Sequence, residues 1–169
     1  MKNTIFKSAF IVSLTLLFAT TTTYAASEKI SGKAPNFTLK SRSGKNIKLS
    51  ELRGEVVMIN FWASWCGPCR QEMPLLEKIH KKYKRLGFTL LGVNVEENSN
   101  DAKNYLKDVK VTFPILFDRT QKTSELYNVS AMPTTVLIDR NGNKRFLHKG
   151  YKPGYENDYK KQIKKLLRE

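Results

Sequence analysis

The most specific chemical feature of the sequence is a pair of cysteines separated by two residues. Trp65 precedes the segment Cys66, Gly67, Pro68 and Cys69, and the chain contains no other cysteine. An apolar run of strand length ends just before this segment and a helical pattern follows it, so Cys66 is expected at a helix N-terminus. Unpaired N–H groups and the helix dipole stabilise a thiolate there and lower its pKa from about 8.5 towards 7 or below. We therefore predict that Cys66 is a nucleophile and that Cys69 resolves the mixed disulfide.

Two other uses of such a pair are less compatible with the sequence. A static disulfide between neighbours this close closes almost no loop and stabilises the fold little. A tetrahedral zinc site needs four ligands, and the remaining candidates, His80 and His148, are expected at the surface. Pro68 suits the first turn of a helix, because an N–H there would have no partner, and Gly67 lets the chain bend. We therefore expect a redox-active pair with no metal and no cofactor.

The elements on either side of the pair are predicted by their hydrophobic patterns. Val56–Phe61 is a continuous apolar run, as in a central strand that is buried on both faces. After Pro68, apolar residues recur at helical spacing as far as Tyr83, and Gly87 is placed to end that helix. The cysteine pair is thus expected at a junction between a buried strand and a helix.

The rest of the chain reads as strands that alternate with helices. The expected strands and helices, in order, are a hairpin over Asn36–Leu49, a strand Phe88–Val95, a helix Ala102–Lys107 that Ser99-Asn100-Asp101 caps, a strand Phe113–Phe117, a helix Thr120–Tyr127, a strand Thr134–Ile138, a strand Lys144–Gly150 after the Asn141-Gly142 turn, and a helix Tyr155–Leu167. This order predicts an α/β sandwich in which helices flank one central mixed sheet.

Length and composition are those of one soluble globular domain. The chain has 169 residues, 40% of them hydrophobic and 27% charged, which excludes fibrous and wholly disordered classes. Its formal net charge of +15 favours anionic partners or an anionic membrane surface. Nucleic acid is not expected, because the lysines are spread along a chain that we predict to be exported. The one dense basic block, Lys160–Arg168, is predicted to be the solvated face of a terminal helix rather than a membrane-docking element.

The N-terminus has the pattern of a signal peptide. Lys2 and Lys7 provide the basic start, and Ala9–Ala19 is an apolar run too short to cross about 30 Å of hydrocarbon. Thr23 and Ala25 are the small residues that a signal peptidase requires. We predict cleavage after Ala25 and a periplasmic protein; the alternative is an uncleaved anchor that keeps the domain at the extracytoplasmic face of the membrane. Residues 26–33 are then a polar lead-in and residues 34–169 the folded domain.

Several segments resemble the thioredoxin superfamily and, more narrowly, the TlpA/ResA-like exported thiol-disulfide oxidoreductases. The similarity extends over nearly all of Ala34–Leu167, and an extra βα unit after Val95 belongs to it. The segments that carry it are APNFTL (Ala34–Leu39), NFWASWCGPC (Asn60–Cys69), CRQEMP (Cys69–Pro74) and MPTTVLID (Met132–Asp139). The resemblance implies a thioredoxin-like sandwich with an N-terminal β-hairpin and one extra βα insertion.

The resemblance also implies a substrate-binding segment opposite the cysteines. The bond between Met132 and Pro133 is expected to be cis and to face the pair. Because Pro133 has no N–H, the exposed backbone of Met132 is free to pair with an extended client segment beside Cys66. Trp65 is expected to cover Cys66. The expected client-binding surface consists of Trp65, Gly67, Pro68 and Met132.

One acidic residue matches the ResA-like branch. Glu72 follows Cys69 by three residues and shares a helix face with it, so it is placed to carry a proton or to tune both thiols. The alternative is a first-turn acid that only complements the helix dipole. Thioredoxins carry a buried Asp six residues before the first cysteine, whereas this chain has Asn60, which cannot exchange a proton. Proton transfer to Cys69 is therefore expected to use Glu72 or water.

The resemblance implies an exported, monomeric dithiol reductant of protein disulfides. A membrane thiol protein is expected to re-reduce the pair, and the family often serves cytochrome c maturation. The same motif can run as an oxidant, because direction depends on potential. A copper-binding chaperone that uses the two thiolates and His148 is a further alternative. A peroxidase is disfavoured because peroxiredoxins, which APNFTL also resembles, need Thr three residues before the reactive cysteine, and this chain has Ala63 there.

Overall fold

A mixed β-sheet forms the centre of the fold. The computed structural model describes residues 27–169, so the predicted signal peptide lies outside the described residues. Within them, six strands pair in the order β1-β8-β7-β4-β5-β6. Their bounds are β1 Glu28–Lys29, β4 Val56–Trp62, β5 Phe88–Asn94, β6 Ile115–Phe117, β7 Thr134–Ile138 and β8 Lys144–Lys149.

The sheet changes direction beside its most buried strand. Every residue of β4 is buried, as its unbroken apolar run predicts. β4 runs parallel to β5, and β5 runs parallel to β6, whereas β7 runs antiparallel to both β4 and β8. Asn60 in β4 is therefore placed between Gly92 of β5 and Thr135 of β7. The predicted mixed sheet of a thioredoxin-like fold is confirmed.

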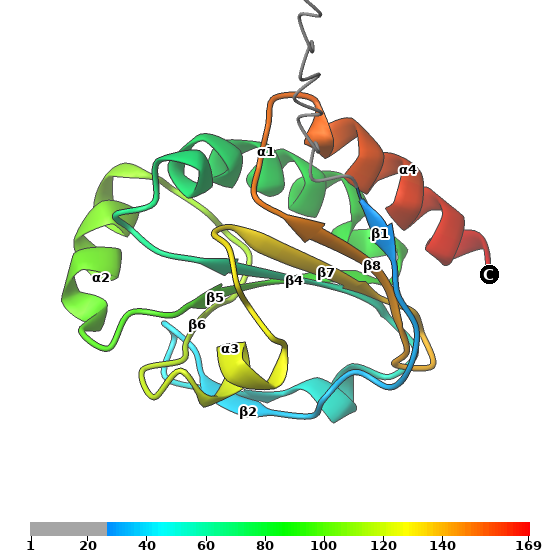
Figure 1. The fold of residues 1–169 in the computed structure, drawn as a ribbon, viewed down its shortest axis with the longest axis horizontal. Coiled ribbons are helices and arrows are strands. Elements are labelled where there is room, and N and C mark those ends of the chain that lie inside the picture. The colour runs from blue at the N-terminus through cyan, green and yellow to red at the C-terminus, as the bar shows by residue number, and fades with distance from the viewer. Residues whose placement is uncertain (1–26) are drawn as a thin grey trace, which may run out of the picture.

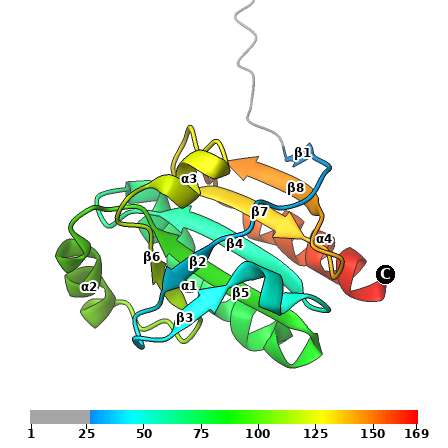
Figure 2. The same cartoon turned by 90° about the horizontal axis from the view of Figure 1, so that it is seen from below.

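Helices cover both faces of the sheet (Figure 1). α1, Gly67–Tyr83, and α4, Tyr155–Arg168, pack side by side on one face. α3, Lys122–Leu126, and the hairpin of β2, Thr38–Lys40, and β3, Asn46–Lys48, lie on the other face, as Figure 2 also shows. α2, Ser99–Asp108, lies beyond the β6 side of the sheet, and the short 3₁₀ turns are Leu49–Leu52 and Lys84–Leu86.

Two details of the secondary structure differ from the sequence-based expectations. Glu28–Lys29, inside the predicted polar lead-in, pairs with β8 as the edge strand β1, so the sheet begins before Ala34. The cap of α2 is Asn98, whose side chain accepts the N–H of Asn100 at 3.1 Å.

The histidine prediction is wrong. His80 and His148 are buried, and their rings pack on Phe113 and Tyr159. Their expected places, on a helix face and in a hairpin, suggested exposure, but neighbours from distant elements cover both rings. None of the helices in residues 27–169 combines the length and the apolar character needed to cross a membrane.

Candidate active site

The cysteine pair lies at the start of α1, where the sequence placed it. Cys66 is the N-cap residue and Pro68 lies in the first turn, where its missing N–H leaves nothing unsatisfied. A disulfide joins Cys66 and Cys69, whose Cα atoms are 5.3 Å apart. The Cys66 sulfur accepts the backbone N–H of Cys69 at 3.2 Å. The helix terminus therefore directs a donor at the sulfur that is predicted to carry the thiolate.

A groove opens beside the pair. Its volume is about 570 Å³, and Trp65, Cys66, Gly67 and Pro68 face the segment 129–132 across it. The bond between Met132 and Pro133 is cis, as the resemblance implies. The structure thus brings together the residues predicted to bind a client.

Trp65 forms the exposed apolar wall of this groove. Its side chain is 69% exposed, while Cys66 is only 4% exposed. The other tryptophan, Trp62, is fully buried and packs on Tyr105 of α2, so it belongs to the core.

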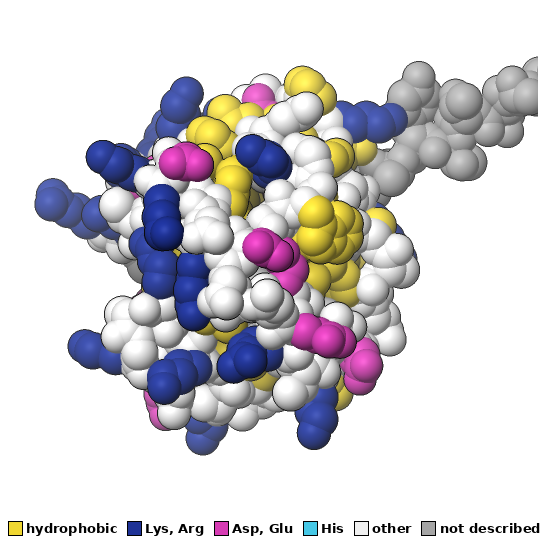
Figure 3. Space-filling view, turned by 90° about the vertical axis from the view of Figure 1, so that its left-hand side faces the viewer, with side chains coloured by type: hydrophobic (Ala, Val, Ile, Leu, Met, Phe, Trp, Pro, Cys, Tyr) yellow, Lys and Arg dark blue, Asp and Glu magenta, His cyan; other side chains and the backbone are white. Residues whose placement is uncertain are grey.

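Figure 3 views the side of the molecule on which α2 lies. Hydrophobic side chains gather on this face next to acidic ones, and Lys and Arg side chains occupy another part of the same face.

Glu72, one helical turn after Cys69 in α1, is surrounded by polar side chains in the protein interior. Its side chain is fully buried. One carboxyl oxygen accepts a hydrogen bond from Asn60 Nδ2 at 2.8 Å, and the other accepts one from the Tyr159 hydroxyl at 2.7 Å. Asn60 Nδ2 also donates to Thr135 Oγ1 at 2.9 Å. Glu72 is therefore not an exposed acid that complements the helix dipole.

Burial changes the protonation of Glu72. Desolvation raises the pKa of its carboxyl to about 7, against the opposing effect of the hydrogen bonds from Tyr159 and Asn60, and the charge of Glu156 raises it further. No hydrogen bond in residues 27–169 joins this carboxyl directly to either cysteine. At neutral pH the group is close to half-protonated, which is the condition for exchanging a proton.

Tyr159 connects this polar cluster to α4. Burial and the nearby Glu72 carboxyl raise the pKa of its hydroxyl, so it stays protonated and donates. The His148 ring packs edge-on against Tyr159 with centroids 4.7 Å apart, and His148 Nε2 bonds Gln162 Oε1 at 2.8 Å. The sequence placed Tyr159 inside the terminal helix but gave no sign that it reaches Glu72.

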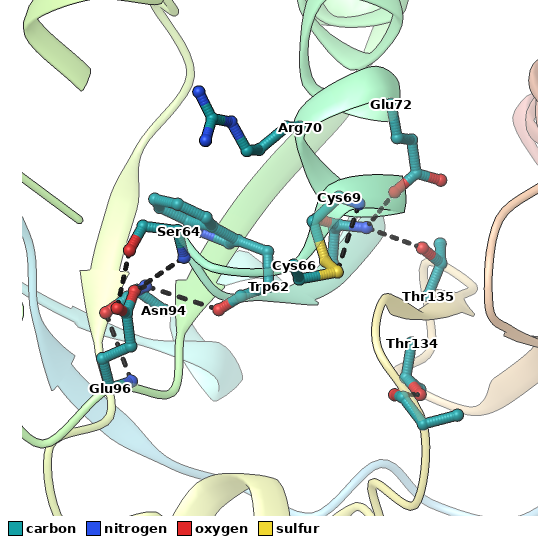
Figure 4. Close-up of a disulfide and its surroundings, with 12 residues drawn as sticks. Trp62, Ser64, Cys66, Cys69, Arg70, Glu72, Asn94, Glu96, Thr134 and Thr135 are labelled. Carbon is teal, nitrogen blue, oxygen red and sulfur yellow. Dashed lines mark hydrogen bonds between the residues drawn. A yellow bond between two sulfur atoms is a disulfide. The ribbon is translucent and has the colours of Figure 1, made fainter. Parts of the chain in front are cut away.

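A second carboxylate, Glu96, is a site residue that sequence reasoning missed. It follows β5, and its oxygens accept the Ser64 backbone N–H at 2.8 Å and the Ser64 hydroxyl at 2.7 Å. Asn94 Nδ2 donates to the same carboxylate at 2.7 Å. Figure 4 shows Ser64, Asn94 and Glu96 on one side of Cys66, with Glu72 and Thr135 on the other. β4 and β5 are parallel neighbours, so the loops that follow them meet at the same end of the sheet. The position of Glu96 directly after a predicted strand is the only sequence signal for this contact.

Glu96 fixes the loop that leads into the pair. Ser64 lies two residues before Cys66, and the Cys66 N–H bonds the carbonyl of Ala63 at 3.3 Å. The Trp62 carbonyl accepts the Val95 N–H at 3.2 Å, which ties the same two loops together again. Glu96 is therefore a positioning residue for the segment that carries Trp65 and Cys66.

Comparisons with known proteins agree with this geometry. A family model described as the AhpC/TSA family matches residues 30–146. The thiol-disulfide oxidoreductase ResA of Bacillus subtilis is 40% identical over 121 residues, 70% of this chain and 68% of that protein. ResA of Bacillus cereus is 37% identical over 121 residues, 70% of each chain.

Solved structures give the same similarity. A structure assigned as the thiol:disulfide interchange protein DsbE of Chlorobium tepidum superposes with a TM-score of 0.79 at 41% identity, over 83% of this chain and 98% of that one. A structure assigned as a protein disulfide isomerase of Bacteroides thetaiotaomicron has a TM-score of 0.75 at 36% identity, over 81% of this chain and 89% of that one.

Proposed function

The chain belongs to the AhpC/TSA family and, within it, to the ResA-like thiol-disulfide oxidoreductases, and we propose that it reduces disulfides of exported client proteins. The observation that carries the proposal is the position of Cys66. Its sulfur is at the N-terminus of α1, accepts a backbone N–H and borders a groove with Met132 on the opposite wall.

The proposed reaction begins on the reduced pair. The Cys66 thiolate attacks one sulfur of a client disulfide, a mixed disulfide forms, and the second client sulfur leaves as a thiolate that takes a proton. Cys69 then loses its proton and attacks the Cys66 sulfur, which releases the first client sulfur. Two electrons have passed to the client, and the protein is left with the disulfide between Cys66 and Cys69.

Glu72 is the proposed acceptor of the Cys69 proton. The carboxyl lies one helical turn from Cys69 and has a pKa of about 7 because of its burial. Asn60 donates to Glu72 but cannot itself take up a proton. The route from the Cys69 sulfur to the carboxyl runs through a water molecule when no direct hydrogen bond forms.

The charges around the pair favour a reductant over an oxidant. Gly67 and Pro68, between the cysteines, offer no charge and no side-chain donor to a Cys66 thiolate. Arg70 extends over the ring of Tyr105, 5.0 Å from its centroid, and points away from the disulfide (Figure 4). Carboxyl groups lie on both sides of the pair, and negative charge destabilises a thiolate. A less stabilised reduced form gives a lower reduction potential.

The finer proposal concerns location and partners. The signal-like N-terminus would deliver the domain to the periplasm, or to the extracytoplasmic face of the membrane if the segment is kept. The electron donor would be a membrane thiol protein, and the clients would include proteins of cytochrome c maturation. The protein would act as a monomer.

Two experiments test the proposal. Equilibration with glutathione should give a potential nearer to about −270 mV than to about −120 mV; a value at the oxidising end would reverse the direction of transfer. The Cys69→Ser variant should retain clients as mixed disulfides on Cys66, whereas Cys66→Ser, the matched control, should retain none. Equal capture by the two variants would contradict the assignment of the nucleophile.

The other activities have their own tests. His148 bonds Gln162 in the interior, and residues 27–169 contain no cluster of three or more His, Cys, Asp and Glu arranged for a metal. Stoichiometric copper binding that is lost in His148→Ala would nevertheless support a copper chaperone. Peroxide consumption that survives Cys69→Ser would support a peroxidase, although Ala63 replaces the threonine that such a site needs.

A further inference from the structure

A second groove lies away from the cysteines, between β1 and α4. Its volume is about 1180 Å³, and we call it the basic groove because six cationic side chains line it: Lys29, Lys160, Lys161, Lys164, Lys165 and Arg168. Lys29 is separated from the others by most of the chain and reaches them because β1 pairs with β8 at this edge of the sheet. Tertiary structure therefore gathers a larger positive cluster than the terminal helix carries alone.

The positive charge of the basic groove is mostly uncompensated. Two acidic residues line it, Asp158 and Glu169, which leaves a net of plus four. Arg145, which is outside the lining, donates to the Glu169 carboxylate from Nη1 at 2.5 Å and from Nη2 at 3.1 Å, and it shares its charge between Glu169 and Asp139. The side chains of Lys161, Lys164 and Lys165 are exposed. A concentrated field of one sign at a surface attracts an extended anionic partner.

The N-terminal segment joins the fold at this groove. Ser27 is one of its lining residues, and the Ser27 hydroxyl accepts Gln162 Nε2 of α4 at 2.8 Å. In the sequence, the apolar run Ala9–Ala19 lies only a short distance before Ser27. If that run is kept as an anchor, the chain that leaves the membrane enters the domain at Ser27, beside these lysines.

We propose that the basic groove is the face with which the protein rests on a bilayer of anionic phospholipid. Clusters of four to eight basic side chains beside a membrane-inserted segment or on an amphipathic helix are attracted to anionic headgroups, and each side chain adds to the affinity. In α4, Tyr159, Ile163 and Leu166 pack into the core, so the lysines of that helix can meet headgroups without any refolding. The sequence alone favoured a solvated helix face, because its lysines lie opposite an apolar face; only the structure adds Lys29 and Ser27 to the same surface.

This orientation directs the cysteine pair away from the bilayer. The first turn of α1 lies beside α2, since the Tyr105 hydroxyl donates to the Arg70 carbonyl at 3.4 Å. Figure 1 shows α2 at the opposite end of the molecule from the C-terminus of α4. A domain held by the basic groove therefore presents Cys66 to soluble clients and to partners that project from the membrane.

Lysine acylation measured by mass spectrometry on the full chain tests the proposal. The protein is mixed with vesicles of phosphatidylcholine alone or with vesicles that also contain phosphatidylglycerol, and the rate of acylation is followed for each lysine. We expect Lys161, Lys164 and Lys165 to react at least fivefold more slowly on the anionic vesicles. The exposed lysines of the α2 region, Lys103 and Lys107, should react equally on both.

This readout works whether or not the N-terminal segment itself binds lipid, because it compares lysines within one protein. Equal rates for the groove lysines on the two vesicle types would overturn the proposal. An equal slowing of the α2 lysines would also overturn it, since it would show attraction by net charge without a preferred face.

A matched pair of triple variants sharpens the result. K161Q/K164Q/K165Q removes three charges from the basic groove, and K103Q/K107Q/K110Q removes three from the α2 region. Protection of Lys29 on anionic vesicles should disappear in the first variant and persist in the second. Loss in both variants, or in neither, would contradict the proposal, and reduction of a soluble disulfide should be unchanged in both.

Discussion

Glu72 and Glu96 flank the cysteine pair on opposite sides, and their surroundings differ. Glu72 is fully buried, takes hydrogen bonds from Asn60 and Tyr159, and has a pKa raised to about 7 by desolvation. Glu96 is half-buried, and its carboxylate binds the backbone N–H and the hydroxyl of Ser64 at the sheet edge.

The difference shows how burial divides two tasks between residues of the same type. A carboxyl whose pKa is near the working pH can exchange a proton with a thiol. A carboxylate that accepts backbone and hydroxyl donors from one loop holds that loop in place. We therefore expect substitutions at Glu72 to change pH-dependent chemistry and substitutions at Glu96 to change the order of the loop before Cys66.

The largest expected effect is on the pH dependence of stability. Below pH 4.5 the Glu72 carboxyl is protonated in both the folded and the unfolded chain. Between pH 4.5 and about 7 only the folded chain keeps the proton, so folding becomes less favourable as the pH rises, by about 3 kcal/mol in total. Urea unfolding of the oxidised protein at pH 4.5 and pH 8 should show this loss as a difference between the parent and Glu72→Gln, because His80 and His148, whose pKa values desolvation lowers, change stability in the opposite direction in both proteins.

Glu96→Gln is the control for that measurement. Because it leaves the buried carboxyl in place, its change in stability between the two pH values should match that of the parent protein. If Glu72→Gln and the parent protein lost the same stability over this range, the assigned protonation of Glu72 would be wrong.

The next effect concerns the rate at which Cys69 resolves a mixed disulfide. The parent rate should rise as the pH passes about 7, because Glu72 must be ionised to accept a proton. Glu72→Gln should lower the resolving rate at neutral pH by about 10²-fold, which is at the lower end of what general-base catalysis contributes. The same variant should remove the increase of the rate near pH 7. Stopped-flow measurement on a pre-formed mixed disulfide gives this step directly. A rate within a few-fold of the parent would show that water alone accepts the proton.

A smaller effect is expected from Glu96→Gln. The loop loses part of a charge-assisted contact with Ser64, at a cost of about 1–2 kcal/mol. Hydrogen exchange at the Ser64 amide should accelerate about tenfold, while exchange in β4 and the pH profile of the resolving step stay unchanged. Ser64→Ala keeps the backbone contact and should have an intermediate effect; a shifted pH profile in Glu96→Gln would remove the distinction between the two carboxyl groups.

The smallest effect is expected from Tyr159→Phe. The hydrogen bond from this hydroxyl lowers the pKa of Glu72, so its loss should move the rise in the resolving rate to higher pH, with a change in stability of about 1 kcal/mol. Tyr127→Phe is the matched control, because its hydroxyl bonds the Pro35 carbonyl on the other side of the sheet. An unmoved profile in Tyr159→Phe would mean that Tyr159 only fills space.

Much of the fold was predictable from local patterns. The apolar run at Val56 predicted β4, and the alternation around Ser43–Lys45 predicted the hairpin of β2 and β3, because side-chain period and turn residues act over a few positions. The same kind of pattern predicted the βα unit with the helix Ala102–Lys107, whereas the cis bond before Pro133 came from the family resemblance. The burial of His80 and His148 was not predictable, because distant elements cover them.

For the site, the sequence by itself determined the two cysteines, their spacing and their place at the start of a helix, since these depend only on neighbours in the chain. The tertiary structure decided that Glu72 is buried, that Tyr159 and Asn60 contact it, and that Glu96 reaches Ser64. Those contacts join segments many residues apart, and desolvation depends on every atom that excludes water from a group. A carboxyl therefore acquires its pKa only when the whole domain has closed around it.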